Sequence, residues 1–284
     1  MEAKHPRLDW RSLDRAALDA GYNNGAAVAN IGAITAAWEA RSAALRQRGD
    51  AMLDLAYGAR PRNRIDFFRC AVPRAPTLAF VHGGYWQMRA KEGFAFLAKG
   101  PLSIGMNVAL VGYTLAPAAS MDEIVAEVRC AIDWLAAQLP ELGGDANKLL
   151  VSGWSAGAHL AAMTMDHPSV RGCLAISGIY DLEPIRHCYV NDKLGLDEAA
   201  ARRNSPMIVQ PSRQVPLAIV VGGAELPLMV QQSVDYAQAL RQQGWPVLFR
   251  EIPGADHFSV LDEVEKSDGA IVGVLRELRA TAGL

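Results

Sequence analysis

The chain has 284 residues, of which 51% are hydrophobic and 20% charged, and its formal net charge is −2. These values are typical of a globular protein that can bury a sizeable core in one large α/β domain or two small ones. Because the net charge is small and no basic run occurs, nothing in the sequence supports nucleic-acid binding or attachment to an anionic membrane.

Signals for targeting or for membrane insertion are not expected. No apolar stretch approaches the roughly 18 residues of a membrane span, and the polar, charged stretch Met1–Arg15 does not resemble a signal peptide. Four cysteines are scattered along the chain: Cys70, Cys130, Cys173 and Cys188. We interpret them as reduced thiols of a cytoplasmic protein, with neither a disulfide framework nor a metal site.

No repeat, low-complexity tract or linker divides the chain, so we expect residues 1–284 to form a single domain. Residues 12–48 show helical spacing interrupted around Gly21–Gly25, which predicts two helices joined by a turn. This helical segment, within residues 1–50, is a candidate cap over the active site. The alternation in Asn63–Cys70 predicts an early, half-exposed antiparallel strand.

Further along, buried strands are expected to alternate with helices. The apolar runs are Thr77–Val81, Asn107–Tyr113, Lys148–Ser152, Gly172–Ser177, Leu217–Val221 and Val247–Ile252. The helical stretches are Met121–Gln138, Ala156–Met165, Leu228–Gln243 and Ser267–Ala280. Continuous apolar runs are typical of strands buried on both faces, so the pattern predicts an α/β fold with a mostly parallel central sheet flanked by helices. In such sheets a ligand binds at the carboxyl ends of the strands.

Two motifs lie at those strand ends. His82–Trp86 reads His-Gly-Gly-Tyr-Trp and Gly153–Gly157 reads Gly-Trp-Ser-Ala-Gly. Gly-x-Ser-x-Gly alone is a weak signal, but between a buried strand and a helix it indicates a nucleophile elbow, a strained turn that exposes a serine hydroxyl. The upstream His-Gly-Gly segment is typical of a loop that presents backbone N–H donors to an oxyanion. We therefore predict acyl transfer through Ser155.

A serine nucleophile needs a general base. Of six histidines, His257 follows the last core strand and reaches the same rim as Ser155, which makes it the candidate base. The others are assigned elsewhere: His5 to the polar N-terminus, His82 to the oxyanion loop, His159 to the interior, and His167 and His187 to surface loops.

The base in turn needs an acid to orient it. Glu225 follows the strand Leu217–Val221 and precedes His257, as the chain order serine, acid, histidine requires. Asp181, one strand earlier, is the alternative acid, although a capping or loop-closing role suits it better.

The oxyanion hole is expected to use backbone N–H groups of Gly83, Gly84, Tyr85 and Ala156, the last of which lies at a helix N-terminus. Aromatic side chains gather on the same motifs. Ordinary packing is one interpretation of these rings, and a flat, apolar substrate pocket is the other. The candidate pocket residues are Tyr22, Trp86, Trp154 and Phe258.

At these residues the chain resembles the α/β-hydrolase family that contains the serine-dependent arylformamidases, or kynurenine formamidases. The similarity extends over nearly the whole chain and is clearest at His82–Trp86, which matches the family's His-Gly-Gly-Tyr-Trp in full. The resemblance assigns the triad to Ser155, Glu225 and His257, with no cofactor. Two residues depart from the family: Trp154 stands where histidine is common, and Glu225 where better-studied members have aspartate.

The resemblance implies hydrolysis of N-formylkynurenine to kynurenine and formate. A carboxylesterase for short acyl esters, or a hydrolase of another amide or carbamate with an aromatic leaving group, is the alternative and would use the same triad. A non-catalytic binding protein on a hydrolase scaffold is a third possibility, which the presence of all three triad residue types disfavours. A small molecule is the expected partner, and a homodimer is left open.

Overall fold

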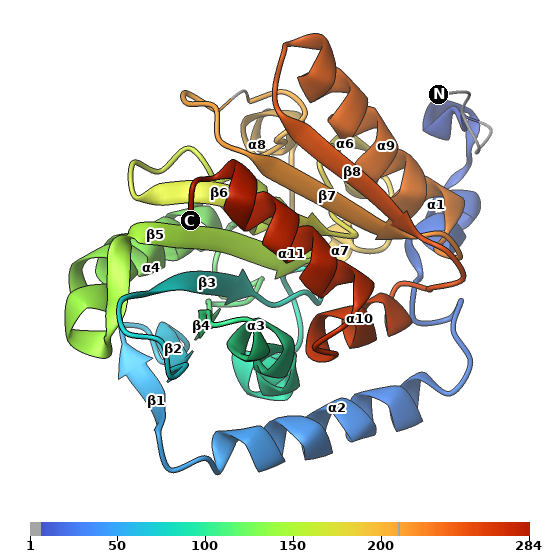
Figure 1. Ribbon diagram of the computed structural model, residues 1–284. Coiled ribbons are helices and arrows are strands. Elements are labelled where there is room, and N and C mark those ends of the chain that lie inside the picture. Colours follow the sequence, from blue (N-terminus) through green and yellow to red (C-terminus); the bar gives the residue numbers. More distant parts are fainter. Residues whose placement is uncertain (1–6, 210) are drawn as a thin grey trace.

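The computed structural model describes residues 7–209 and 211–284, and an eight-stranded sheet forms its centre (Figure 1). The strands are β1 (Ala51–Ala56), β2 (Arg64–Phe68), β3 (Ala75–Val81), β4 (Asn107–Val111), β5 (Gly144–Trp154), β6 (Val170–Ile176), β7 (Leu217–Gly222) and β8 (Val247–Ile252). Their order across the sheet is β1-β2-β4-β3-β5-β6-β7-β8. The pairs β1–β2 and β2–β4 are antiparallel, and all later neighbours are parallel. The carboxyl ends of β3, β5, β6 and β7 therefore share one edge, where a ligand site is expected.

Helices cover both faces of this sheet. One apolar cluster joins α1 (Arg15–Tyr22), α4 (Met121–Leu142), α5 (Ala156–Ala162) and α9 (Pro227–Gln242) to one face. A second joins α2 (Ile31–Arg46), the 3₁₀ helix η2 (Lys91–Ala98), α10 (Asp262–Glu265) and α11 (Ala270–Thr281) to the other. The remaining short helices are η1 (Trp10–Ser12), α3 (Lys99–Ser103), α6 (Glu183–Arg186), α7 (Asn191–Leu194), α8 (Glu198–Arg203) and η3 (Ser259–Leu261). The prediction of a mostly parallel sheet flanked by helices is confirmed.

Local sequence signals account for the ends of the longest helix, α4. Ser120 and Glu123 form a capping box, in which each side chain accepts a hydrogen bond from the backbone N–H of the other residue. At the other end Gly143 adopts the left-handed conformation with φ 85°, which glycine allows without steric cost. The capping box fixes the beginning of α4 and Gly143 fixes its end, so that β5 begins at the next residue, Gly144.

Two strand predictions were wrong in their exposure. β2 was expected to be half-exposed, but Ile65 to Phe68 are all buried because α2 and η2 cover the face opposite the main core. Asp66 on that face is fully buried and pairs with Arg46 of α2 and with Nζ of Lys91 at 2.7 Å. Val247–Ile252 was expected to be buried on both faces, but β8 lies at the edge of the sheet and is mostly half-exposed.

The two helices expected within residues 12–48 are present as α1 and α2 (Figure 1). α2 lies against η2, where Trp38 packs among Phe94 and Phe96. α1 packs against α9 on the other side of the sheet. The N-terminal segment thus contacts both faces of the core.

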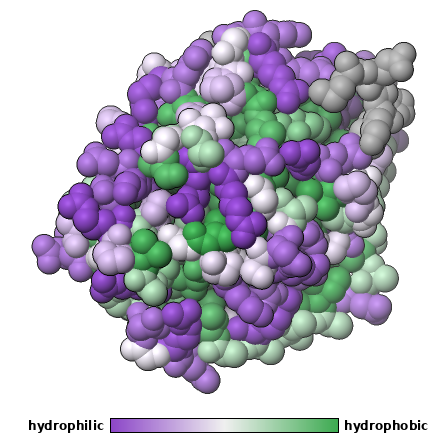
Figure 2. Space-filling model, in the orientation of Figure 1, coloured by the Kyte–Doolittle hydropathy of each residue, from purple (hydrophilic) through white to green (hydrophobic). Residues whose placement is uncertain are grey.

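The face of the molecule drawn in Figure 2 is largely polar. Figure 2 shows hydrophilic side chains over most of one face, with hydrophobic residues exposed in small areas between them. Within residues 7–209 and 211–284, no helix is both long enough and apolar enough to cross a membrane. All four cysteines are free thiols, and Cys130 is the exposed one.

Candidate active site

Ser155 stands in a sharp turn between β5 and α5. Its φ of 56° and ψ of −122° lie outside the regions that a serine normally occupies, and such strain is common at functional sites. The turn is held by the backbone, since Ser155 N donates to Ile176 O at 2.9 Å. The turn places Ser155 at the carboxyl end of β5, at the shared edge of the sheet.

The glycines on either side of Ser155 are required by close backbone contacts. A Cβ on Gly153 would lie 2.2 Å from the carbonyl oxygen of Gly157, and a Cβ on Gly157 would lie 2.0 Å from that of Val81. The strand, the turn and the helix therefore cross at a distance that excludes any side chain.

We expect Gly157→Ala to lower the free energy of unfolding by at least about 2 kcal/mol, because the new methyl group can be accommodated only by moving β3 away from α5. Gly273→Ala in α11 is the matched control, since no heavy atom of the described residues outside its own helix backbone lies within 4 Å of the Cβ position. That change is expected to be neutral or to stabilise by about 0.5–1 kcal/mol. Urea unfolding of both variants tests the pair, and equal stabilities would contradict the crowded turn.

Glu225 and His257 are in direct contact. Nδ1 of His257 lies 2.6 Å from Oε2 of Glu225, and both residues are buried. Oε1 of the same carboxylate accepts hydrogen bonds from Gly222 N at 2.7 Å and from the Ser177 hydroxyl. With donors on both oxygens the carboxylate is fixed in one orientation. An imidazole that donates from Nδ1 leaves Nε2 as the proton acceptor.

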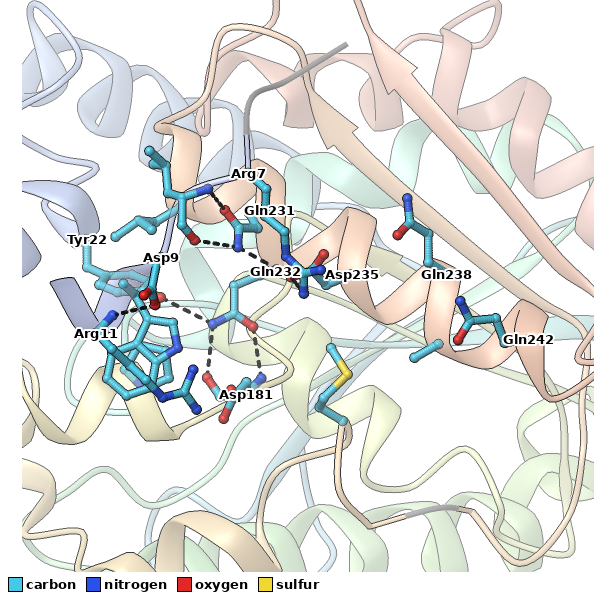
Figure 3. A pocket seen from close by; sticks show the side chains of 16 residues that line it. Arg7, Asp9, Arg11, Tyr22, Asp181, Gln231, Gln232, Asp235, Gln238 and Gln242 are labelled. Carbon is cyan, nitrogen blue, oxygen red and sulfur yellow. Dashed lines mark hydrogen bonds and ion pairs between the residues drawn. The ribbon is translucent and has the colours of Figure 1, made fainter. Parts of the chain in front are cut away.

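The alternative acid, Asp181, lies away from this imidazole. Its Oδ1 accepts from Glu183 N at 2.9 Å, in the loop-closing role considered from the sequence. It lines a cavity of about 570 Å³ between the N-terminal segment and α9, together with Tyr22 and Gln232 (Figure 3). Gln232 contacts the backbone of Asp181 through both ends of its amide. The structure therefore places Glu225, and not Asp181, against His257.

The loop after β3 lies directly beside Ser155. A Cβ on Gly83 would lie 2.6 Å from the Trp154 ring and 3.1 Å from Cβ of Ser155, the candidate nucleophile. Three successive residues, Gly84, Tyr85 and Trp86, have positive φ values of 117°, 50° and 58°. This conformation turns the loop sharply next to Ala156, the first residue of α5.

The side chain of His82, the first residue after β3, stabilises this loop. Its Nδ1 lies 2.8 Å from Gly83 O, and its ring stacks on Tyr113 with centroids 4.4 Å apart. The Tyr113 hydroxyl donates to His82 O at 3.0 Å. Burial lowers the pKa of His82 to about 4, so the ring is neutral at pH 7. His82 is thus a structural residue of the loop.

The end of α1 is hydrogen-bonded to the same loop. The Tyr85 hydroxyl donates to Tyr22 O, and Nδ2 of Asn24 donates to the Tyr85 hydroxyl at 3.1 Å. On its other side the Tyr22 hydroxyl accepts from Gln232 at 3.2 Å. Tyr22 therefore lines the cavity of Figure 3 and is also hydrogen-bonded to the loop. Its assignment as a pocket wall, and that of residues 1–50 as a cap, stay predictions.

The other aromatic residues of the motifs are packed around the site. The Trp154 ring lies 4.8 Å from the His257 ring, and its Nε1 donates to His257 O at 2.8 Å. Phe258 packs against the Trp154 ring at 5.6 Å. Trp86 is fully buried and donates from Nε1 to Nδ1 of His159 at 3.2 Å. The Trp86 side chain is thus packed in the interior, and the role of these rings as substrate walls stays a prediction.

His159 points into the interior, as expected from its place on the helix after Ser155. Its Nδ1 accepts from Trp86, so its Nε2 donates to Asn204 O at 2.6 Å. Burial lowers the pKa of His159 to about 4. Of the remaining histidines, His167 contacts Asp133 and His187 is exposed, whereas His5 lies outside the described residues.

This burial predicts a pH-dependent loss of stability. The unfolded chain binds a proton on His159 near pH 6.5, whereas the folded protein does so only near pH 4, so acid favours unfolding across that interval. We expect the free energy of unfolding to fall by about 3 kcal/mol more in wild type than in His159→Gln between pH 6.5 and 4, and to level off below. Glutamine can both accept from Trp86 and donate to Asn204. Denaturant unfolding at several pH values checks this, and identical pH profiles would contradict it.

Two contacts of the site were not foreseen from the sequence. Ser177, at the end of β6, has a φ of 52° and donates to Glu225, and Trp154 holds the backbone of His257. The position of Ser177 directly after a buried strand is the signal that could have identified it. Among the described residues, no group of three or more His, Cys, Asp or Glu side chains could hold a metal ion.

Comparison with known proteins agrees with the observed fold. A family model described as alpha/beta hydrolase fold matches residues 78–261. The kynurenine formamidase of Danio rerio is 31% identical, over 90% of this chain and 93% of its own. Esterase LipC of Mycobacterium tuberculosis is 30% identical, over 72% of this chain and 59% of its own. A solved structure from Silicibacter sp. tm1040 is 29% identical, with a TM-score of 0.83, and covers 91% of this chain and 98% of its own. The chain therefore belongs to the α/β-hydrolase family, in which it is a hydrolase of the kynurenine formamidase-like group.

Proposed function

We propose that this protein is an arylformamidase that hydrolyses N-formylkynurenine to kynurenine and formate, with Ser155 as nucleophile, His257 as general base and Glu225 as the orienting acid. The observation that carries the proposal is the 2.6 Å contact between Glu225 and His257 on the sheet edge that also holds Ser155. The similarity to kynurenine formamidase over almost the full length of both chains supports the choice of substrate.

In the proposed reaction the Ser155 hydroxyl attacks the formyl carbon while Nε2 of His257 removes its proton. The negative charge that develops on the formyl oxygen is stabilised by N–H groups of Ala156 and of Gly83, Gly84 or Tyr85. His257 then gives its proton to the arylamine nitrogen as the C–N bond breaks. Water, deprotonated by His257, then attacks the formyl ester; the bond to Oγ of Ser155 breaks, His257 returns its proton to that oxygen, and formate is released.

Each partner has a defined task in this scheme. Glu225 holds the imidazole in the tautomer that accepts from serine and stabilises the imidazolium that forms. Two donors on its other oxygen prevent the carboxylate from turning away from His257. The backbone donors are held ready by strained loops, so little reorganisation is needed during the reaction.

The test is turnover of N-formylkynurenine by the purified protein, followed by kynurenine absorbance and formate release. We expect a kcat/KM for this substrate well above that for p-nitrophenyl acetate, and His257→Ala should abolish both activities. The similarity to esterase LipC favours a short-chain carboxylesterase as the second candidate. Turnover of the ester alone would establish that candidate and reject the formamidase.

A further inference from the structure

Arg89 is an unusual residue in the loop between the oxyanion segment and η2. Its φ of 72° is uncommon for a non-glycine residue. Its guanidinium carbon lies 5.6 Å from the ring centre of Trp38, 5.7 Å from that of Trp154 and 5.8 Å from that of Phe258. Three rings from separate parts of the chain thus surround one cationic side chain, an arrangement that favours a positive charge at this place.

The charge of Arg89 has no hydrogen-bonded counterion within the part of the chain that the structure describes. None of the described carboxylates or carbonyl groups accepts a hydrogen bond from its guanidinium. Burial lowers the pKa of Arg89. The carboxylate of Glu39 on α2 opposes this shift by electrostatic attraction, without a hydrogen bond to the guanidinium. Because partly buried charges are normally paired, this guanidinium is available to an anionic ligand.

Arg41 on α2 provides a direct comparison. Its guanidinium also lies over an aromatic ring, 4.6 Å from the centre of Phe96. Unlike Arg89, it is paired with two carboxylates, Asp262 at 3.3 Å and Glu265. The cation–ring contact of Arg41 is therefore accompanied by hydrogen-bonded carboxylates, whereas that of Arg89 has none among the described residues.

Arg89 is also close to the proposed catalytic residues. The Trp154 ring contacts both Arg89 and His257: its centre lies 5.7 Å from the guanidinium carbon and 4.8 Å from the centre of the His257 ring. Arg89 also lines a cavity of about 490 Å³ between α2 and the start of η2. In N-formylkynurenine seven bonds separate the formyl carbon from the carboxylate carbon, a span of roughly 7–8 Å when extended. A group of that length can reach past one ring.

We propose that Arg89 is a specificity-determining residue that binds the carboxylate at the distal end of the substrate, and that Trp38, Trp154 and Phe258 direct its guanidinium toward that anion. This inference rests on the proposed active site and deepens it, because it selects aryl substrates that carry an anionic tail. A planar guanidinium binds a carboxylate through two parallel hydrogen bonds, which lysine cannot reproduce.

The experiment compares anionic and neutral probes on wild type, Arg89→Met and Arg89→Lys. One pair is N-formylkynurenine and 2-formamidoacetophenone, which lacks the amino-acid tail. The other is 3-(2-acetoxyphenyl)propanoate and its primary amide, which requires only esterase activity. We expect Arg89→Met to reduce the anionic-to-neutral ratio of kcat/KM at least tenfold, mainly through KM, and Arg89→Lys to restore part of it. Arg41→Met, the matched control, should change the ratio less than twofold.

A measurement on the wild-type protein tests the proposal without relying on a variant that could misfold. We expect 3-phenylpropanoate to inhibit at least tenfold more strongly than 3-phenylpropanamide, and this preference to weaken at high salt. Equal inhibition by the two compounds, or an equal loss on anionic and neutral probes in Arg89→Met, would overturn the proposal. Failure of both formamides with turnover of the ester pair rejects the formamidase function alone, and the ester pair then decides the role of Arg89.

Discussion

Replacing Ser155 with alanine is expected to lower kcat by about four to six orders of magnitude on any substrate that the protein hydrolyses. The change removes the attacking oxygen and leaves the turn intact, because alanine and serine meet the same restriction at a φ of 56°. Residual activity above the uncatalysed rate is expected, since the backbone donors remain. Steady-state kinetics on N-formylkynurenine and p-nitrophenyl acetate measure the effect.

Ser152→Ala is the matched control for this variant. Ser152 lies on β5, three residues before Ser155; it is fully buried, and its hydroxyl has no hydrogen-bond partner among the described residues. Its loss should leave kcat within twofold of wild type. If Ser155→Ala keeps more than a hundredth of the activity, the nucleophile is another group.

The second large effect is expected for Glu225→Gln, a decrease in kcat of about 10³–10⁴-fold. Glutamine has the shape of glutamate but carries one donor and one acceptor group. If its amide nitrogen faces Nδ1 of His257, the imidazole must accept there and Nε2 becomes protonated, so it cannot take the serine proton. If the amide is turned round, its nitrogen faces the N–H of Gly222 and the hydroxyl of Ser177. Each orientation disrupts the site.

Asp181→Asn separates the two candidate acids. Asp181 accepts a hydrogen bond from Glu183 N in its own loop and has no contact with His257, so this change is expected to alter kcat less than fivefold. The pH–rate profiles of both variants complete the comparison. An activity loss in Asp181→Asn that equals that in Glu225→Gln would transfer the orienting role to Asp181.

The sequence predicted the parallel core of the fold because these strands are buried on both faces and appear as unbroken apolar runs. β1 was missed because Ala51–Ala56 has no regular alternation and Asp54 has a φ of 57° where its register with β2 shifts. The short helices between β6 and β7 were missed because pieces of four to six residues carry too little periodicity.

Part of the candidate site could likewise be predicted from the sequence, and part could not. Ser155, Glu225 and His257 could be predicted as candidates because each follows a recognisable strand in the order that the fold requires. Ser177 and Arg89 could not, because their significance depends on distant partners: Ser177 on a carboxylate 48 residues later, and Arg89 on rings from α2, β5 and the loop after β8. No local pattern records such contacts.

Mass spectrometry of the protein after reaction with a fluorophosphonate tests the central claim most directly, because only an activated hydroxyl attacks this reagent rapidly. We expect a single adduct on the peptide that contains Ser155, formed at least a hundredfold more slowly in Glu225→Gln. An unmodified protein, or an adduct on any other residue, would contradict the assignment.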